Sequence, residues 1–156
     1  MSWRHGHRWV YLVTAACMIF LGYGIYVVGR GQGSAVFQKI PASYYLENTW
    51  KGLGFDGLLQ DNPILIYSLP DGMWMFAVMC VQLWIWGAVF NKYTALWMTI
   101  VYIICLANEG LQKIGYSPGT FDVNDLLFMV VGGLLPIMIE LTLQKSVRWK
   151  ESKNQH

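Results

Sequence analysis

Four long apolar runs, separated by polar breaks, dominate the pattern of this chain and predict four helices that cross a membrane. The runs lie at about residues 9–28, 73–90, 93–112 and 123–143. The first run holds twenty residues without a charge. At a rise of about 1.5 Å per residue, a helix of that length spans about 30 Å, the thickness of the hydrocarbon core of a bilayer. The predicted fold is therefore all-α, a four-helix transmembrane bundle.

The first run follows Arg4 and Arg8, as the apolar region of a secretory signal peptide would. It is long for such a region, and no convincing cleavage motif of small residues follows it directly. We therefore expect the first run to remain as a transmembrane helix.

The segment at about 29–70 mixes charged and aromatic residues, including Glu47 and Trp50, and is too polar to cross a membrane. Such amphipathic mixtures lie at the membrane surface or cover the end of a bundle. Within it, Ser43 is expected to cap a short helix that ends near Lys51. The prediction is an outer amphipathic loop between the first two spans.

Composition agrees with a membrane protein. Hydrophobic residue types make up 55% of the 156 residues and charged types 13%, about half the charged fraction of a soluble domain. The eight Trp and nine Tyr suit the bilayer interfaces. This length allows one domain, residues 1–156, and the composition excludes a soluble enzyme. The net charge of +2 is small and dispersed, so a nucleic-acid partner is not expected.

The distribution of Lys and Arg predicts the orientation. With four spans both termini lie on one side of the membrane, and that side carries seven Lys and Arg residues against four on the other. Because positive charge accumulates in short cytoplasmic segments, both termini are expected in the cytoplasm, in a bacterial cytoplasmic membrane.

This topology places polar residues from three spans at the same outer level. Asp71 begins the second span, Glu109 and Gln112 end the third, and Asp122 and Asp125 begin the fourth. Glu109 and Gln112 are three residues apart, as are Asp122 and Asp125, so each pair shares one helix face. These five residues are the candidate binding site.

A structural interpretation competes with a functional one at each position. Ser68 with Asp71, three residues on, can cap the N-terminus of one helix, and Asp122 with Asp125 can cap another. Acids at a helix N-terminus also interact favourably with the helix dipole. Glu109 lies near a helix C-terminus, where an acid opposes the dipole. It either pairs with Lys113, four residues on, or faces the bundle and meets polar groups of the second and fourth spans.

Other chemistry is scarce. The histidines are His5, His7 and His156, all near the termini, and neither a Ser-His-Asp set nor a phosphate-binding glycine loop occurs. We therefore expect no metal and no cofactor, and the pattern favours a protein that is not an enzyme. Near the inner end of the fourth span, Glu140 is expected to turn towards the head groups and to pair with Gln144 or Lys145.

The motifs at the outer level resemble those of the VanZ-like family of small bacterial membrane proteins. They are Asp71 at the start of a span, Glu109-Gly-Leu-Gln112 at the end of the next, and a Gly-x-x-Asp-x-x-Asp-x6-Gly run from Gly119 to Gly132. The resemblance implies an antiparallel bundle of about four spans. The family takes its name from a protein linked to resistance to the antibiotic teicoplanin, and its activity is undefined. The chain lacks the His, Arg and Asn that often accompany these motifs in the family.

Three functional hypotheses follow. In the first, the chain is a VanZ-like protein of the cell envelope that binds a lipid-linked or cell-wall component at the outer acids. In the second, the chain is a membrane subunit or immunity-type partner that acts by helix packing. In either case membrane lipids are expected to contact the chain. A third hypothesis is a proton relay or transport component that uses Glu109 with Asp122 or Asp125, although only Gln82 and Glu140 offer a polar path inward.

Overall fold

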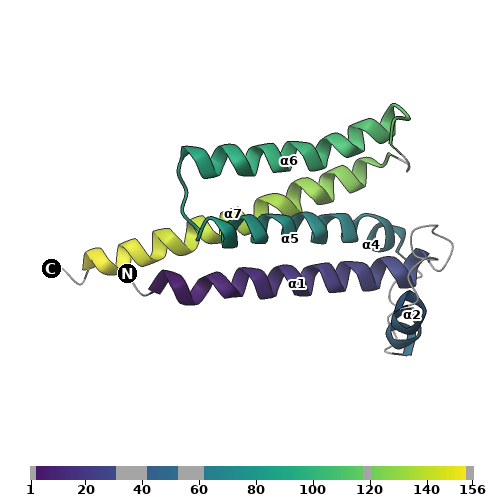
Figure 1. Ribbon diagram of the computed structural model, residues 1–156, viewed down its shortest axis with the longest axis horizontal. Helices are drawn as coiled ribbons and strands as arrows, with labels where there is room; N and C mark the ends of the chain where they lie inside the picture. The colour runs from purple at the N-terminus through teal and green to yellow at the C-terminus, as the bar shows by residue number, and fades with distance from the viewer. Residues whose placement is uncertain (1–2, 31–41, 53–61, 118–120, 154–156) are drawn as a thin grey trace.

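The computed structural model describes residues 3–30, 42–52, 62–117 and 121–153, and within these ranges all regular structure is helical. The helices are α1 (Trp3–Arg30), α2 (Ala42–Gly52), α4 (Pro63–Tyr67), α5 (Leu69–Ile85), α6 (Lys92–Lys113) and α7 (Val123–Lys153), shown in Figure 1. The all-α prediction is confirmed.

Four stretches are long and apolar enough to cross a membrane: Arg8–Gly29, Pro63–Ile85, Lys92–Lys113 and Val123–Val147. The predicted four spans are thereby confirmed, and the chain is a multi-pass membrane protein. Both termini lie at one end of the bundle, and α2 and α4 lie at the other (Figure 1). We call these the terminal end and the distal end.

The second span differs from its predicted range of 73–90, because α5 starts at Leu69 and ends at Ile85. Pro70 lies in the first turn of α5, where its missing N–H is not needed. Gly87 and Ala88 have φ of 61° and 56°, a left-handed conformation that ends the helix. The apolar pattern continues to residue 90, so it could not reveal this turn.

The fourth helix also differs, because α7 continues ten residues past the predicted end at 143, to Lys153. Lys, Gln and Glu are good helix formers, so the helix extends although its sequence has become polar. The predicted helix before Lys51 is present as α2, but Ser43 lies inside it. The rest of the predicted outer loop falls mainly on 31–41 and 53–61, outside the described residues.

Helix α5 occupies the centre, with α1 packed against one side and α7 against the other (Figure 1). The contact between α5 and α7 is made by glycines. A Cβ atom on Gly72 would lie 2.9 Å from the carbonyl oxygen of Phe128, and one on Gly132 would collide with the carbonyl oxygen of Gly72. The two backbones therefore touch, as small residues permit in membrane bundles.

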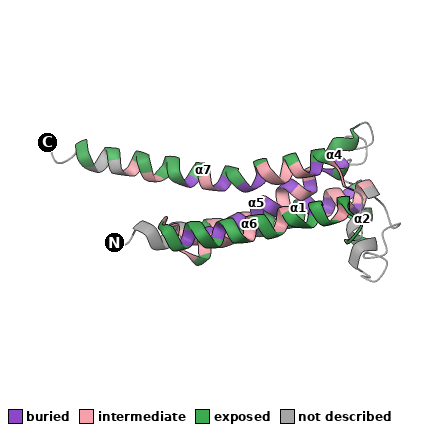
Figure 2. Ribbon diagram, turned by 90° about the horizontal axis from the view of Figure 1, so that it is seen from above, coloured by how far each residue is buried: buried purple, intermediate pink, exposed green. Residues whose placement is uncertain are grey.

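Exposed residues cover much of α6 and α7 (Figure 2), and they include many large apolar side chains such as Trp97, Ile103 and Leu134. A soluble protein rarely exposes such a surface, whereas helices surrounded by lipid are expected to do so. Helix α5 contributes more buried side chains than any other described helix, including Met75, Met79 and Leu83.

Candidate functional site

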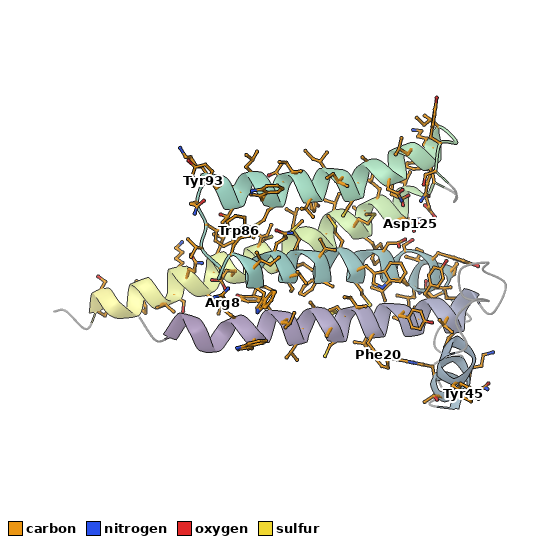
Figure 3. All side chains as sticks on the ribbon, viewed as in Figure 1. Arg8, Phe20, Tyr45, Trp86, Tyr93 and Asp125 are labelled. Atoms are coloured by element: carbon orange, nitrogen blue, oxygen red, sulfur yellow. The ribbon has the colours of Figure 1, made fainter. Side chains whose placement is uncertain are left out.

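At the distal end, three helices each contribute a buried polar side chain. Ser68 at the start of α5, Glu109 near the end of α6 and Asp125 in the first turn of α7 are 1%, 5% and 6% exposed. Figure 3 labels Asp125 near this end of the bundle. The contacts between the helices determine how these three side chains lie relative to one another.

Helices α6 and α7 are antiparallel, and Tyr102 sets their register. The Tyr102 hydroxyl donates to the Val130 carbonyl oxygen at 2.8 Å, and its ring lies directly against Gly133. Glu109 follows Tyr102 by seven residues, which is two turns along the same helix face. Glu109 is thus level with Asp125, and the carboxyl groups of Asp125 and Asp122 act on it electrostatically.

Helices α5 and α7 run in parallel, and Gly72 sets their register by its contacts with Phe128 and Gly132. Ser68 precedes Gly72 by four residues and shares its helix face. Asp125 precedes Phe128 by three residues. Ser68, Glu109 and Asp125 therefore lie at one level of the bundle, and we call these three residues the distal polar cluster.

The buried Oγ of Ser68 and the buried Oε2 of Glu109 lack a hydrogen-bond partner among the residues that the structure describes. Ser68 occupies the N-cap position of α5, but its side chain makes no capping hydrogen bond, so the predicted cap is absent. A buried polar atom without a partner costs about 1–3 kcal/mol and requires an explanation.

The ion pair considered for Glu109 and Lys113 does not form. The ammonium group of Lys113 is placed over the Phe121 ring, 5.1 Å from its centroid. Lys113 is exposed, whereas Glu109 turns into the bundle. A long lysine side chain reaches the aqueous boundary and an aromatic ring more easily than it follows a buried carboxylate.

The other predicted residues have different surroundings. Asp122 Oδ1 accepts a hydrogen bond from the backbone N–H of Asn124 at 2.9 Å and caps α7, as the structural interpretation expected. Asp71 is half-buried in the first turn of α5. Gln112 is half-buried one turn beyond Glu109, and its side chain makes no hydrogen bond within the described part of the chain.

Ser68 was not among the predicted site residues, because its sequence context suggested only a cap. The signal that could have identified it is its spacing from Gly72. A glycine within an apolar span marks a close helix contact, and a polar residue four positions away lies on the same contact face.

A second polar cluster lies at the terminal end. Glu140 of α7 is 8% exposed and accepts hydrogen bonds from the Tyr11 hydroxyl and, at 2.7 Å, from the Gln144 side chain. The Gln144 amide also donates to the Ala88 carbonyl oxygen at 2.6 Å. We call Tyr11, Glu140 and Gln144 the terminal polar cluster. The predicted pairing with Gln144 is confirmed, but the prediction that Glu140 turns towards the head groups is wrong.

Arg8 supports the same end of the bundle (Figure 3). Its guanidinium group donates to the carbonyl oxygens of Trp84, at 2.9 Å, and Ile85, at 3.3 Å. These are the last carbonyls of α5, which a cation stabilises through hydrogen bonds and through the helix dipole. Arg8 thus ties the start of α1 to the end of α5.

The two clusters differ in what they can do chemically. Both carboxylate oxygens of Glu140 are hydrogen-bonded within the chain, so the terminal polar cluster needs no ligand. The distal polar cluster retains unused acceptors on Glu109 and Ser68. The described residues contain no group of three or more His, Cys, Asp or Glu side chains suited to a metal ion. The distal polar cluster is therefore the candidate site, and its atoms suit a ligand that donates hydrogen bonds.

Comparisons of the chain with protein-family models, with curated proteins and with solved structures found no match.

Proposed function

We propose that this chain is a VanZ-like protein of the bacterial cell envelope that binds the polar head group of a lipid-linked or cell-wall component at the distal polar cluster. The observation that carries the proposal is Glu109, whose Oε2 is buried without a hydrogen-bond partner among the described residues. An ionisable residue at membrane depth is costly, and such residues mark functional sites by default.

The proposal places the chain in the cytoplasmic membrane with both termini in the cytoplasm, as its Lys and Arg distribution favours. In that orientation the distal end lies in the outer leaflet. Lipid-linked envelope components present their head groups there, level with Glu109. The resemblance of the outer motifs to the VanZ-like family supports the same assignment.

The alternatives have less support. A subunit that acts by packing alone would leave its acids pointing apart into solvent, whereas Glu109 and Asp125 are buried. A proton relay would need a polar path through the bundle. Glu140, the acid at the other end of such a path, already accepts hydrogen bonds from Tyr11 and Gln144.

The test is the set of lipids and lipid-linked molecules that purify with the full chain. Wild-type protein, Glu109→Gln and the matched control Glu140→Gln are extracted from the same membranes, and the bound molecules are identified by mass spectrometry. We expect a component that is retained by the wild type and by Glu140→Gln but lost from Glu109→Gln. A set of bound molecules that does not change with Glu109→Gln would rule out the distal polar cluster as the binding site.

A further inference from the structure

The atoms of the distal polar cluster that have no hydrogen-bond partner, Ser68 Oγ and Glu109 Oε2, can both accept a hydrogen bond. Oε2 of Glu109 belongs to a carboxylate, which only accepts when ionised, and Oγ of Ser68 has acceptor lone pairs as well as one O–H. A ligand that completes this cluster must therefore bring N–H or O–H donors. A phosphate or carboxylate group would instead face the acids and be repelled.

The charges around Glu109 favour a cationic donor. Among the residues that the structure describes, Asp125 and Asp122 act on it electrostatically, and both are acids. Lys113, the basic residue nearest to Glu109 along α6, is engaged with the Phe121 ring. A sugar hydroxyl would supply a donor but would leave the negative charge uncompensated, whereas a cation supplies both.

The number and kind of acceptors distinguish among cations. Calcium takes six to eight oxygen ligands, and in the described ranges the acids do not form a group suited to a metal ion. A quaternary ammonium has no N–H and is held by aromatic rings instead. A primary ammonium has three N–H donors, so Glu109 and Ser68 can take two, and the third remains for water or for the ligand itself.

The depth of the cluster indicates where the ammonium comes from. Ser68, Glu109 and Asp125 lie five, four and two residues from the distal ends of their spans, Pro63–Ile85, Lys92–Lys113 and Val123–Val147. At a rise of about 1.5 Å per residue, these positions are about 3–8 Å inside the span ends. These positions lie near the boundary between the hydrocarbon core and the head groups, which the polar part of a membrane amphiphile can reach.

We infer that the distal polar cluster binds the primary ammonium group of a membrane amphiphile, as in an aminophospholipid head group, with Glu109 Oε2 and Ser68 Oγ as its acceptors. This inference rests on the proposed function and names the chemical class of its ligand. The side chains that hold the amine come from α5 and α6, whose distal ends the ligand would join.

The experiment measures lipid binding to the full chain in detergent by native mass spectrometry. Three lipids with the same acyl chains are titrated: phosphatidylethanolamine, phosphatidylcholine and N-acetylphosphatidylethanolamine. They carry a primary ammonium, a quaternary ammonium and a neutral amide. We expect wild-type protein to bind phosphatidylethanolamine about tenfold more tightly than either of the others, a difference of about 1.4 kcal/mol.

The variants identify the site. Glu109→Gln and Ser68→Ala are expected to reduce the tenfold preference to about one, whereas Glu140→Gln keeps it because that carboxyl belongs to the terminal polar cluster. Each variant is compared only after it elutes as a single folded species. If Glu109→Gln does not fold, Ser68→Ala tests the same preference, because it removes one unpartnered hydroxyl and little volume.

The outcomes separate this inference from the proposed function. Equal binding of the three lipids overturns the ammonium assignment, even if a component lost from Glu109→Gln still purifies with the wild type. Displacement of phosphatidylethanolamine by an equal concentration of free ethylamine overturns the assignment to an amphiphile. Preference for phosphatidylethanolamine that survives both Glu109→Gln and Ser68→Ala overturns the site.

Discussion

Glu109 and Glu140 are both glutamates buried within spanning helices, yet their surroundings are opposite. Glu140 receives hydrogen bonds from Tyr11 and Gln144. Glu109 keeps one oxygen without a partner in the described part of the chain and is approached by other acids. A buried charge stabilises a fold only when the interactions with its partners outweigh the free-energy cost of removing it from water. The two residues should therefore respond in opposite directions to loss of charge.

We predict that Glu109→Gln leaves the free energy of unfolding unchanged or raises it by about 1 kcal/mol. The amide removes a buried charge next to Asp125 and Asp122, and residues kept for function commonly reduce stability. The measurement is the midpoint of thermal unfolding of the purified protein at neutral pH. A loss of about 1 kcal/mol or more would instead assign Glu109 a structural role.

We predict that Tyr11→Phe lowers the free energy of unfolding by about 1–3 kcal/mol, because it leaves a buried carboxylate oxygen of Glu140 without its donor. The same thermal measurement tests it. Tyr116→Phe is the matched control, since Tyr116 is 83% exposed and should change stability by less than about 0.5 kcal/mol. Equal effects of the two substitutions would show that the Tyr11 hydroxyl contributes nothing specific.

At the scale of the helices, the contact between α5 and α7 determines where the distal polar cluster forms. Gly72 and Gly132 bring the two backbones together, and this contact places Ser68 and Asp125 at the same level of the bundle. Glycines within a membrane span, such as Gly132 in the fourth apolar run, are typical of a close helix contact. The sequence could not name α5 as that helix, because the pattern of one span carries no information about its neighbour.

We predict that Gly132→Ala destabilises the protein by about 1–3 kcal/mol or more, because its new methyl group would meet the Gly72 carbonyl of the facing backbone. Gly110→Ala is the control within α6. It has no atom within 4 Å of its added methyl group, so alanine should stabilise that helix by roughly 0.5–1 kcal/mol. The sign of the change in unfolding midpoint distinguishes the two, and a neutral Gly132→Ala would contradict the close backbone contact.

At the scale of the whole molecule, the four spans bring both termini to one end and both α2 and α4 to the other (Figure 1). The end of α6 and the start of α7 also lie at the distal end (Figure 1). The distal polar cluster therefore lies towards the side of the membrane opposite the termini, and the orientation of the chain decides which leaflet that is.

We predict that a membrane-impermeant thiol reagent labels Tyr116→Cys in intact cells and labels Ser152→Cys only after the membrane is opened. Both positions are exposed, one at the distal end and one near the end of α7. Labelling is read against the unsubstituted chain, whose three native cysteines lie within the spans. The reverse pattern would place the termini outside and the distal polar cluster in the inner leaflet.

The sequence by itself determined the all-α class, the four spans and the placement of the acids at the span ends opposite the termini. These are local properties: a bilayer requires about twenty apolar residues per helix, and that requirement is visible in each run separately. It also indicated that Glu109 was unusual, because an acid at a helix C-terminus needs compensation.

Only the tertiary structure decided which polar groups share a site. Three features depend on how one helix is rotated against another. They are the burial of Ser68, the contact of the Lys113 ammonium group with the Phe121 ring, and the hydrogen bond from Tyr11 to Glu140. Rotation and register are set by contacts between residues far apart in the chain. A pattern read along one helix therefore places a polar residue on a face, but the neighbouring helix determines what that face meets.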